Sequence, residues 1–293
     1  MNRLFDRFLV FWAWASGVLL LATISCIIGY LVIKGAKTLN LGLIFGDTDP
    51  IDAILLKRQV FDGLFPAIVG TLLLILLSVT WAIPVGIASG IYLAEYAGKR
   101  TSRILNLLFD ILAGIPSIVV GLFGLSTALV LHKHFSEDIY PCLLISSLAL
   151  ALLVLPYIVR TTQVSLENLS TESRLTALAL GATKLQNIFY VLIPKSLAGI
   201  ASGVILAIGR CAEDTAVIML TGVVATAGVP NSILSNYEAL PFYIYYISAQ
   251  YADRQELLTG YGAAIILLAL CVILFSSAFF IKRQLAYYSL YRA

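Results

Sequence analysis

Three ionisable side chains, Arg210, Glu213 and Asp214, lie close together in an otherwise apolar stretch, and Thr215 follows them directly. In a helix, spacings of three and four residues place both carboxylates beside the guanidinium on one face. A guanidinium is suited to an oxyanion, and a carboxylate can orient it or accept a proton from a hydrogen-bearing anion. The four residues therefore predict one of two roles: a site on a translocation route, or an ion-paired cluster that only holds helices together.

The composition indicates a membrane protein. Of the 293 residues, 60% are hydrophobic and 12% are charged, and the mean hydropathy is +0.96. Soluble domains carry about 25% charged residues. The small net charge of +3 gives no indication of a nucleic-acid partner.

Six apolar segments are long enough to cross a bilayer, which requires about 20 residues. They are Phe8–Ile33, Ala67–Leu93, Ile104–Leu131, Tyr140–Val159, Leu197–Val224 and Leu257–Ile281. Because backbone polar groups cannot stay unpaired in lipid, we expect each segment to be helical. The chain 1–293 is predicted to be one all-α membrane domain, with kinks at Pro84 and Pro116. The first segment is too long for a signal-peptide core, so we expect it to be retained.

The charged cluster would then lie near the middle of the fifth segment. A charge at that depth costs several kcal/mol unless it is paired or hydrated. One arginine against two carboxylates gives a formal charge of −1, which repels anions. An anion site would therefore need a protonated carboxylate or a cation from a neighbouring subunit.

Lysine and arginine are concentrated on one side of this topology. Twelve lie at the termini and in the connections 99–103 and 160–195: Arg3, Arg7, Lys99, Arg100, Arg103, Arg160, Arg174, Lys184, Lys195, Lys282, Arg283 and Arg292. Six lie on the opposite side: Lys34, Lys37, Lys57, Arg58, Lys133 and Arg254. Since basic residues favour the cytoplasmic side, both termini and the connection 160–195 are predicted to be cytoplasmic.

The segment Thr171–Pro194 has the pattern of two short amphipathic helices. Apolar residues share one face of each helix, Leu175, Leu178, Ala179 and Ala182 on the first and Leu185, Ile188, Phe189 and Leu192 on the second. Gly181 stands between them, where a helix end favours a residue that tolerates positive φ. Thr183 and Gln186 fit a capping box, and Pro194 is expected to end the second helix. Such a pair beside a membrane predicts a docking surface for a soluble partner.

The remaining features of the sequence do not predict a catalytic or metal site. The chain has no G-x-x-x-x-G-K-[ST] phosphate-binding motif, so we do not expect it to bind or hydrolyse ATP. We expect His132 and His134 in a solvated turn and not at a metal site, and Asp110 in a cap or at the membrane interface. The connection 225–256 is rich in tyrosine and phenylalanine, which fits either interfacial anchors or a docking surface for an external protein.

The segment 171–194 resembles the EAA loop, E-A-A-x3-G-x9-I-x-L-P, of permease subunits of binding-protein-dependent ABC importers with the type I, MetI-like fold. Gly181 matches the motif's glycine, and 191–194 closes it at the right distance. At the start, 175–177 reads Leu-Thr-Ala where Glu-Ala-Ala is usual, so only Ala177 agrees. This match identifies 160–197 as an EAA-type coupling loop.

Within that family the chain is most similar to the phosphate permeases, roughly over residues 67–225. The likeness is carried by 91–96 (IYLAEY), 110–124 (DILAGIPSIVVGLFG) and 155–160 (LPYIVR), together with the loop and the fifth segment. Phosphate permeases typically read R-A-x-G-E-T-A where 210–216 reads RCAEDTA. Another tetrahedral oxyanion, such as molybdate, tungstate or sulfate, therefore remains an alternative substrate.

The resemblance implies an importer in the bacterial cytoplasmic membrane. Its other parts would be a second similar permease, two ATPase subunits that use Mg-ATP, and an extracytoplasmic binding protein, while this chain would bind no cofactor. The coupling residues would be Leu175, Ala177, Leu178, Gly181, Ala182, Leu185, Ile188, Phe189 and Pro194. Two alternatives come from the intramembrane charges alone: a proton-coupled secondary transporter, and a membrane scaffold.

Overall fold

The computed structural model describes residues 3–135 and 140–291, and Arg292, one of the basic residues counted for orientation, lies outside these ranges. The described residues form α1 (Arg3–Gly35), η1 (Ala36–Thr38), α2 (Leu41–Phe45), α3 (Pro50–Ile54), α4 (Phe65–Glu95), α5 (Lys99–Gly114), α6 (Ser117–His134), α7 (Leu143–Glu167), α8 (Thr171–Ala179), α9 (Lys184–Asn187), η2 (Ile188–Leu192), α10 (Ile193–Glu213), α11 (Ala216–Thr221), α12 (Leu240–Gln250) and α13 (Arg254–Tyr291). Among them, six helices are long and apolar enough to cross a membrane, which confirms the predicted all-α membrane architecture.

The core of the bundle lies between α4, α7 and α10. Leu74 of α4, Val154 of α7 and Ala207 of α10 belong to one buried cluster. The backbones of α4 and α7 approach closely at two glycines, because a Cβ on Gly86 or Gly90 would lie under 3 Å from atoms of α7. Such close contact along two helices makes α4 and α7 a rigid unit.

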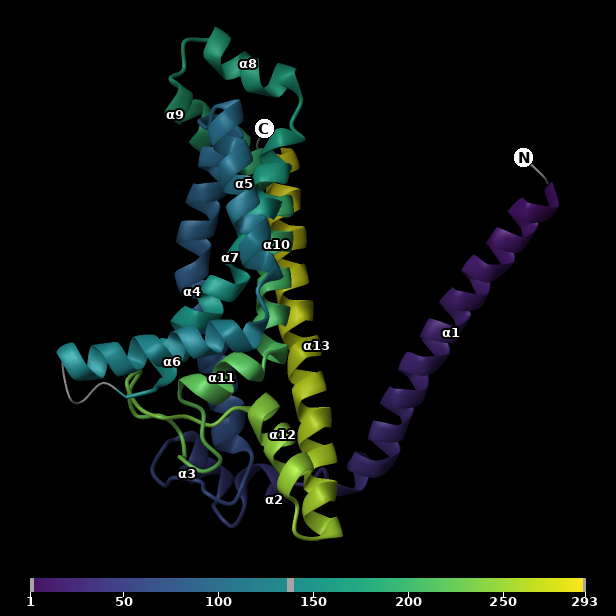
Figure 1. The fold of residues 1–293 in the computed structure, drawn as a ribbon, viewed down its shortest axis with the longest axis vertical. Helices are drawn as coiled ribbons and strands as arrows, with labels where there is room; N and C mark the ends of the chain where they lie inside the picture. Colours follow the sequence, from purple (N-terminus) through teal and green to yellow (C-terminus); the bar gives the residue numbers. More distant parts are fainter. Residues whose placement is uncertain (1–2, 136–139, 292–293) are drawn as a thin grey trace.

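The short helices gather at the two ends of the bundle. Figure 1 shows α8 and α9 at one end, together with the start of α1 and the end of α13. The helices α2, α3 and α12 lie at the opposite end. This arrangement agrees with an even number of crossings.

Helix α1 stands apart from the bundle in Figure 1 and approaches it only near its C-terminal end. There the rings of Tyr30 and Tyr261 meet with centroids 5.9 Å apart, and Gly35 lies against Ile265 of α13. No residue in the most apolar window of this helix is buried within the chain. Its apolar surface must therefore be covered by lipid or by another subunit.

The third predicted span, Ile104–Leu131, is wrong as a single helix. The chain breaks between α5 and α6, and in Figure 1 α6 lies across the bundle axis while α5 runs along it. Pro116 causes the break, because a proline disfavours helical ψ in the residue before it, and Ile115 has an extended ψ of 129°. As a result His132 and His134, expected in a turn, lie in the last turn of α6.

The predicted end of the second amphipathic helix and that of the fifth predicted span are also wrong. Pro194 does not end a helix, since the helical chain continues from Lys184 to Glu213. The wider turn of η2, in which the Ile193 N–H donates to the Ile188 carbonyl, directly precedes Pro194 and accommodates a residue without an N–H. At the other end α10 stops at Glu213, and a separate helix, α11, follows.

Candidate functional site

The charged cluster lies at the junction of α10 and α11, at a helix end instead of inside a continuous span. Arg210 Nη1 lies 2.7 Å from Glu213 Oε1, and Arg210 Nη2 lies 3.6 Å from Asp214 Oδ2. The predicted spacing therefore does bring the three charges together. Thr215 is half-buried in the junction itself, and its carbonyl accepts the Met219 N–H at 3.0 Å.

Asp214 has a structural role in this junction. Its side chain is only 2% exposed, and Oδ1 accepts the backbone N–H of Val217 at 2.9 Å. A side-chain acceptor of this kind competes with the helical hydrogen-bond pattern, which explains why α10 ends here. The other oxygen of the carboxylate faces Arg210, so both oxygens are engaged.

Arg210 and Glu213 differ from Asp214 in what covers them. The Arg210 side chain is 34% exposed and that of Glu213 is 64% exposed on the surface of the single chain. Within a membrane-spanning region such charges face protein or water, because facing lipid costs several kcal/mol. The Arg210 guanidinium and the Glu213 carboxylate are therefore the parts of the cluster that a ligand or a second subunit can reach.

The second candidate site is the turn between α8 and α9, which has the predicted geometry. Gly181 has φ +88°, its N–H donates to Leu178, and the Ala182 N–H donates to the Ala177 carbonyl, both at 3.0 Å. These two bonds are the Schellman pattern that closes a helix on a glycine. The Thr183 capping box is also present, with both reciprocal bonds.

The apolar side chains of this segment fall into two groups. Leu175, Leu178, Leu185 and Phe189 are exposed, and Leu180, which was not predicted to take part, is 85% exposed. Ile188 and Leu192 are buried, in a small cluster with Leu166 of α7. We call the exposed apolar side chains of α8, α9 and the start of η2 together the α8–α9 apolar face, whereas the buried group attaches the segment to the bundle.

Among the remaining predicted coupling residues, Ala177, Ala182 and Pro194 are half-buried. Ala177 and Ala182 are joined by the hydrogen bond that closes α8, so they shape the turn instead of presenting a large apolar surface. Pro194 lies in the first turn of α10, directly after η2. Its position leaves it outside the α8–α9 apolar face.

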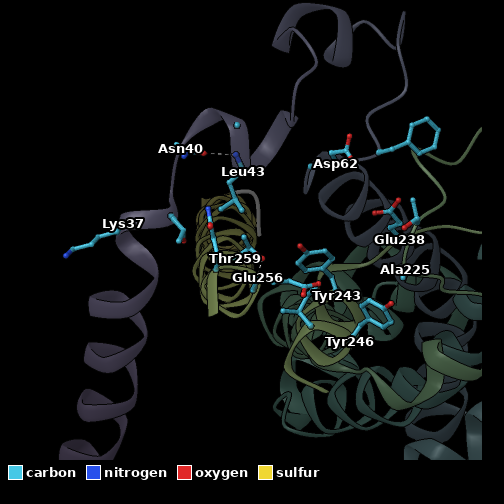
Figure 2. Close-up of a pocket in the computed structure, with 17 residues that line it drawn as sticks. Lys37, Asn40, Leu43, Asp62, Ala225, Glu238, Tyr243, Tyr246, Glu256 and Thr259 are labelled. Carbon is cyan, nitrogen blue, oxygen red and sulfur yellow. Dashed lines mark hydrogen bonds between the residues drawn. The ribbon is translucent and has the colours of Figure 1, made fainter. Parts of the chain in front are cut away.

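At the opposite end of the bundle a pocket of about 590 Å³ opens between α12, α13 and the connection from α1 to α4. Figure 2 shows Tyr243 and Tyr246 of α12 beside Glu238, with Glu256 nearby and Lys37 at the margin. Tyrosines predicted as anchors or as a docking surface thus line a hollow that a partner could enter.

Glu238 fixes the wall of this pocket. Its carboxylate is buried and accepts the backbone N–H groups of Ala227 and Gly228, both at 2.8 Å. Burial raises the pKa of Glu238, and the two backbone hydrogen bonds only partly oppose that effect. Nearby, Gln59 Oε1 accepts the Val229 N–H at 2.9 Å, so this loop is held from two sides.

Residues 82–287 match the family described as the inner membrane component of binding-protein-dependent transport systems. The chain belongs to this family. The matched range includes α7 to α12, and with them the charged junction and the α8–α9 turn. The resemblance stated from the sequence is confirmed.

Relatives of this permease carry the name phosphate transport system permease protein PstA. The Yersinia pestis protein is 34% identical, over 83% of this chain and 78% of its own length. The Haemophilus influenzae protein is 33% identical, over 74% and 76%. PstA 1 of Mycobacterium tuberculosis (strain CDC 1551 / Oshkosh) is 32% identical, over 73% and 68%.

Solved structures support the fold of this permease. A chain of the inward-facing MetNI methionine ABC transporter has a TM-score of 0.59 at 19% identity, covering 81% of this chain and 99% of that one. A chain of the bacterial alginate ABC transporter, in complex with a pentasaccharide-bound periplasmic protein, has a TM-score of 0.66 at 16% identity, with coverages of 97% and 99%. The predicted MetI-like permease fold is confirmed.

Two ion pairs in this permease were missed by reasoning from sequence. Asp110, expected in a cap or at the membrane interface, lies inside α5 and not at a cap position, and Arg160 Nη2 lies 3.1 Å from its carboxylate. Arg174 of α8 pairs with Glu95 at the end of α4. Arg174 had been counted only for orientation, and the sole available signal was that Glu95, Asp110 and Arg160 lie in stretches shared with the phosphate permeases.

Proposed function

We propose that this chain is the PstA-type permease subunit of an ATP-driven importer that carries inorganic phosphate across the bacterial inner membrane. Its similarity to several PstA proteins over most of its length supports phosphate as the substrate. The observation that carries the mechanism is the α8–α9 apolar face, because exposed leucines and a phenylalanine at the end of a bundle require a partner.

That partner is an ATPase subunit. The face is built on a rigid turn, with the Schellman closure at Gly181 and the capping box at Thr183, so it can transmit force instead of deforming. Two cytoplasmic ATPase subunits would bind Mg-ATP and close, while this chain would bind no cofactor itself. Closure would move the loop and switch the permease between inward and outward openings.

A second permease of the PstC type would complete the membrane part. The support comes from two surfaces that this chain leaves uncovered, the most apolar part of α1 and the exposed side chains of Arg210 and Glu213. The charged cluster at the junction has a formal charge of −1, and a neighbour that covers it could also supply a compensating positive charge. The phosphate route would then run along the surface between the two permeases.

Arg210 is the residue of this chain that would meet the anion. Its guanidinium is partly exposed, while the Asp214 carboxylate is occupied with the Val217 N–H and with Arg210 itself. Glu213 and Thr215 would line the same stretch of the route. Selectivity would come largely from an extracytoplasmic phosphate-binding protein, and the tyrosine-lined pocket beside Glu238 is a surface for its docking.

The orientation follows from this assignment. The α8–α9 face must point to the cytoplasm, where ATP is available. Both termini then lie on the cytoplasmic side too, because the start of α1 and the end of α13 lie at the same end of the bundle. The excess of lysine and arginine on that side supports the same orientation.

Uptake of radiolabelled phosphate in cells with and without the partner ATPase tests the proposal. We expect uptake to require the ATPase and to resist competition by sulfate, molybdate and tungstate. Uptake that persists without the ATPase would instead support a proton-coupled secondary transporter. Full competition by another oxyanion would leave the ABC permease intact and change its substrate.

A further inference from the structure

The inner side of α8 is fastened to the ends of two long helices by one arginine. Arg174 Nη1 donates to the Glu95 carboxylate in the last turn of α4, and Nη2 donates to the Leu166 carbonyl near the end of α7. Arg174 Nε donates to the Leu169 carbonyl at 3.5 Å. We propose that Arg174 and Glu95 are positioning residues that transmit the movement of the coupling loop to α4 and α7.

The chemistry of the site suits a fixed joint. The last carbonyls of a helix have no partner within it, and a cation near them is also favoured by the helix dipole. A guanidinium has several N–H donors in a rigid fork, so it can hold a carboxylate and carbonyl groups at once. The side chains are 24% exposed for Arg174 and 11% for Glu95, so water screens the pair only weakly.

Lys184 at the start of α9 adds a second attachment at the same place. Its ammonium donates to the Glu95 carbonyl and lies 4.3 Å from the centre of the Tyr96 ring. The buried Asn187 amide donates to the Arg174 carbonyl at 2.9 Å, which joins α9 to α8. Both helices of the loop are therefore tied to the end of α4.

These contacts end on two helices that are packed closely against each other. Helices α4 and α7 are in close backbone contact at Gly86 and Gly90, and a Cβ at Gly90 would lie 2.6 Å from Thr162. A displacement of α8 that pulls on α4 and α7 together would therefore move them as one body. Without the joint, α8 could rotate on the ATPase surface without displacing the spans.

This inference rests on the proposed function, because it takes the force to come from an ATPase on the α8–α9 face. The test uses the complete importer in proteoliposomes and measures phosphate taken up per ATP hydrolysed. The variants are Arg174→Gln, Glu95→Gln and the double variant. Lys195→Gln is the matched control, because Lys195 Nζ also contacts α8, at Ser173 Oγ (3.3 Å), but holds no helix end.

We expect each single variant to keep its ATPase subunits. The phosphate taken up per ATP hydrolysed should fall about ten-fold, which corresponds to about 1.4 kcal/mol. The double variant should be no worse than the worse single one, because residues that act through one contact are not additive. Lys195→Gln should retain the wild-type ratio. A wild-type ratio in assembled Arg174→Gln, or fully additive losses, would overturn the joint.

A second measurement does not depend on how the charge variants fold. Spin labels at Glu172→Cys on α8 and Tyr92→Cys on α4, both exposed positions, report the distance between the two helices. Cys26 and Cys271 are replaced by serine in this background. We expect the same distances without nucleotide and with ATP, and a change on ATP binding would refute a rigid joint. If the importer with wild-type Arg174 and Glu95 shows no ATP-driven uptake at all, the proposed function fails instead.

Discussion

Replacing Gly181 by valine is expected to weaken coupling without disturbing any neighbouring atom. Gly181 has φ +88°, in a region that residues with a Cβ rarely adopt, and no other atom lies within 4 Å of where its Cβ would be placed. The substitution therefore tests backbone strain alone. A left-handed conformation costs roughly 1–2 kcal/mol for a residue other than glycine, and a β-branched side chain lies at the unfavourable end.

That strain acts on the closure of α8. The hydrogen bond from the Ala182 N–H to the Ala177 carbonyl depends on the positive φ of Gly181, because that torsion sets where the Ala182 N–H points. A cost of about 1–2 kcal/mol lowers the population of the closed turn, relative to open ones, by about 5- to 30-fold. We expect phosphate uptake per ATP hydrolysed to fall, while the amount of assembled complex stays the same.

Gly181→Asn is the matched control, because asparagine tolerates the left-handed region better than valine does. We expect the asparagine variant to retain most of the coupling. Hydrogen exchange at the Ala182 amide should become faster only in the valine variant. Equal coupling in glycine, asparagine and valine proteins would refute the argument that a rigid turn transmits force. Loss of assembly in the valine protein alone would show that the turn matters for folding instead.

Three further predictions address the other sites. Arg210→Ala should abolish most phosphate uptake. Arg210→Lys should assemble normally with reduced uptake, because it keeps a cation beside the buried Asp214 carboxylate. Unchanged uptake in an assembled alanine variant would remove Arg210 from the route. Thr183→Ala removes the capping box and should destabilise the start of α9 by about 1 kcal/mol, measured as faster hydrogen exchange at the amides of 184–187. Thr176→Ala is the control, because it loses only a bond back to the Glu172 carbonyl and should leave that exchange unchanged. Burial raises the pKa of Glu238, so its protonated form stabilises the fold. That stabilisation is fully present below the unfolded-state pKa and is lost as pH rises through the folded-state pKa. Protection of the loop 225–231 from hydrogen exchange, corrected for the intrinsic rate, should therefore fall over that pH range in the wild type but not in Glu238→Gln.

Local rules predicted the turn between α8 and α9 well. Gly181, Thr183 and Gln186 act through bonds to residues a few positions away, so their types and spacing contain the whole argument. The number of apolar segments long enough to span the membrane was predictable for the same reason. Length and hydropathy are properties of each segment by itself.

Helix boundaries were harder to predict, because they depend on local backbone conformations and side-chain hydrogen bonds that compete with the helical pattern and are not visible in hydropathy. At Pro116 the sequence indicated a kink, yet the extended Ile115 redirects the chain completely. At Pro194 the expected helix end is absent, because η2 widens the turn before the proline. At Asp214 an apolar pattern continues on both sides, yet the helix ends where the Asp214 backbone becomes extended and its side chain accepts the Val217 N–H.

The Arg174 joint could not be predicted because its partners are far apart in sequence. Arg174 and Glu95 are separated by 79 positions. No periodicity links them, and membrane topology alone is an adequate explanation for a basic residue in a connection predicted to be cytoplasmic. Packing of α4 against α7 brings their ends together, and only then do Glu95 and the Leu166 carbonyl meet one guanidinium.

The two arginine networks also differ in what completes them. The Arg174 network is closed within this chain, since its acceptors all belong to α4, α7 and the turn that follows α7. The Arg210 network is open, with Glu213 mostly exposed at membrane depth. An open charge there requires a second protein surface or water, whereas a closed pair requires neither. The proposed coupling contacts therefore lie within this chain, whereas the proposed route would be shared with a neighbouring subunit. Variants of the joint should act in the same way whichever second permease is present, while the effect of Arg210 variants should change with that partner.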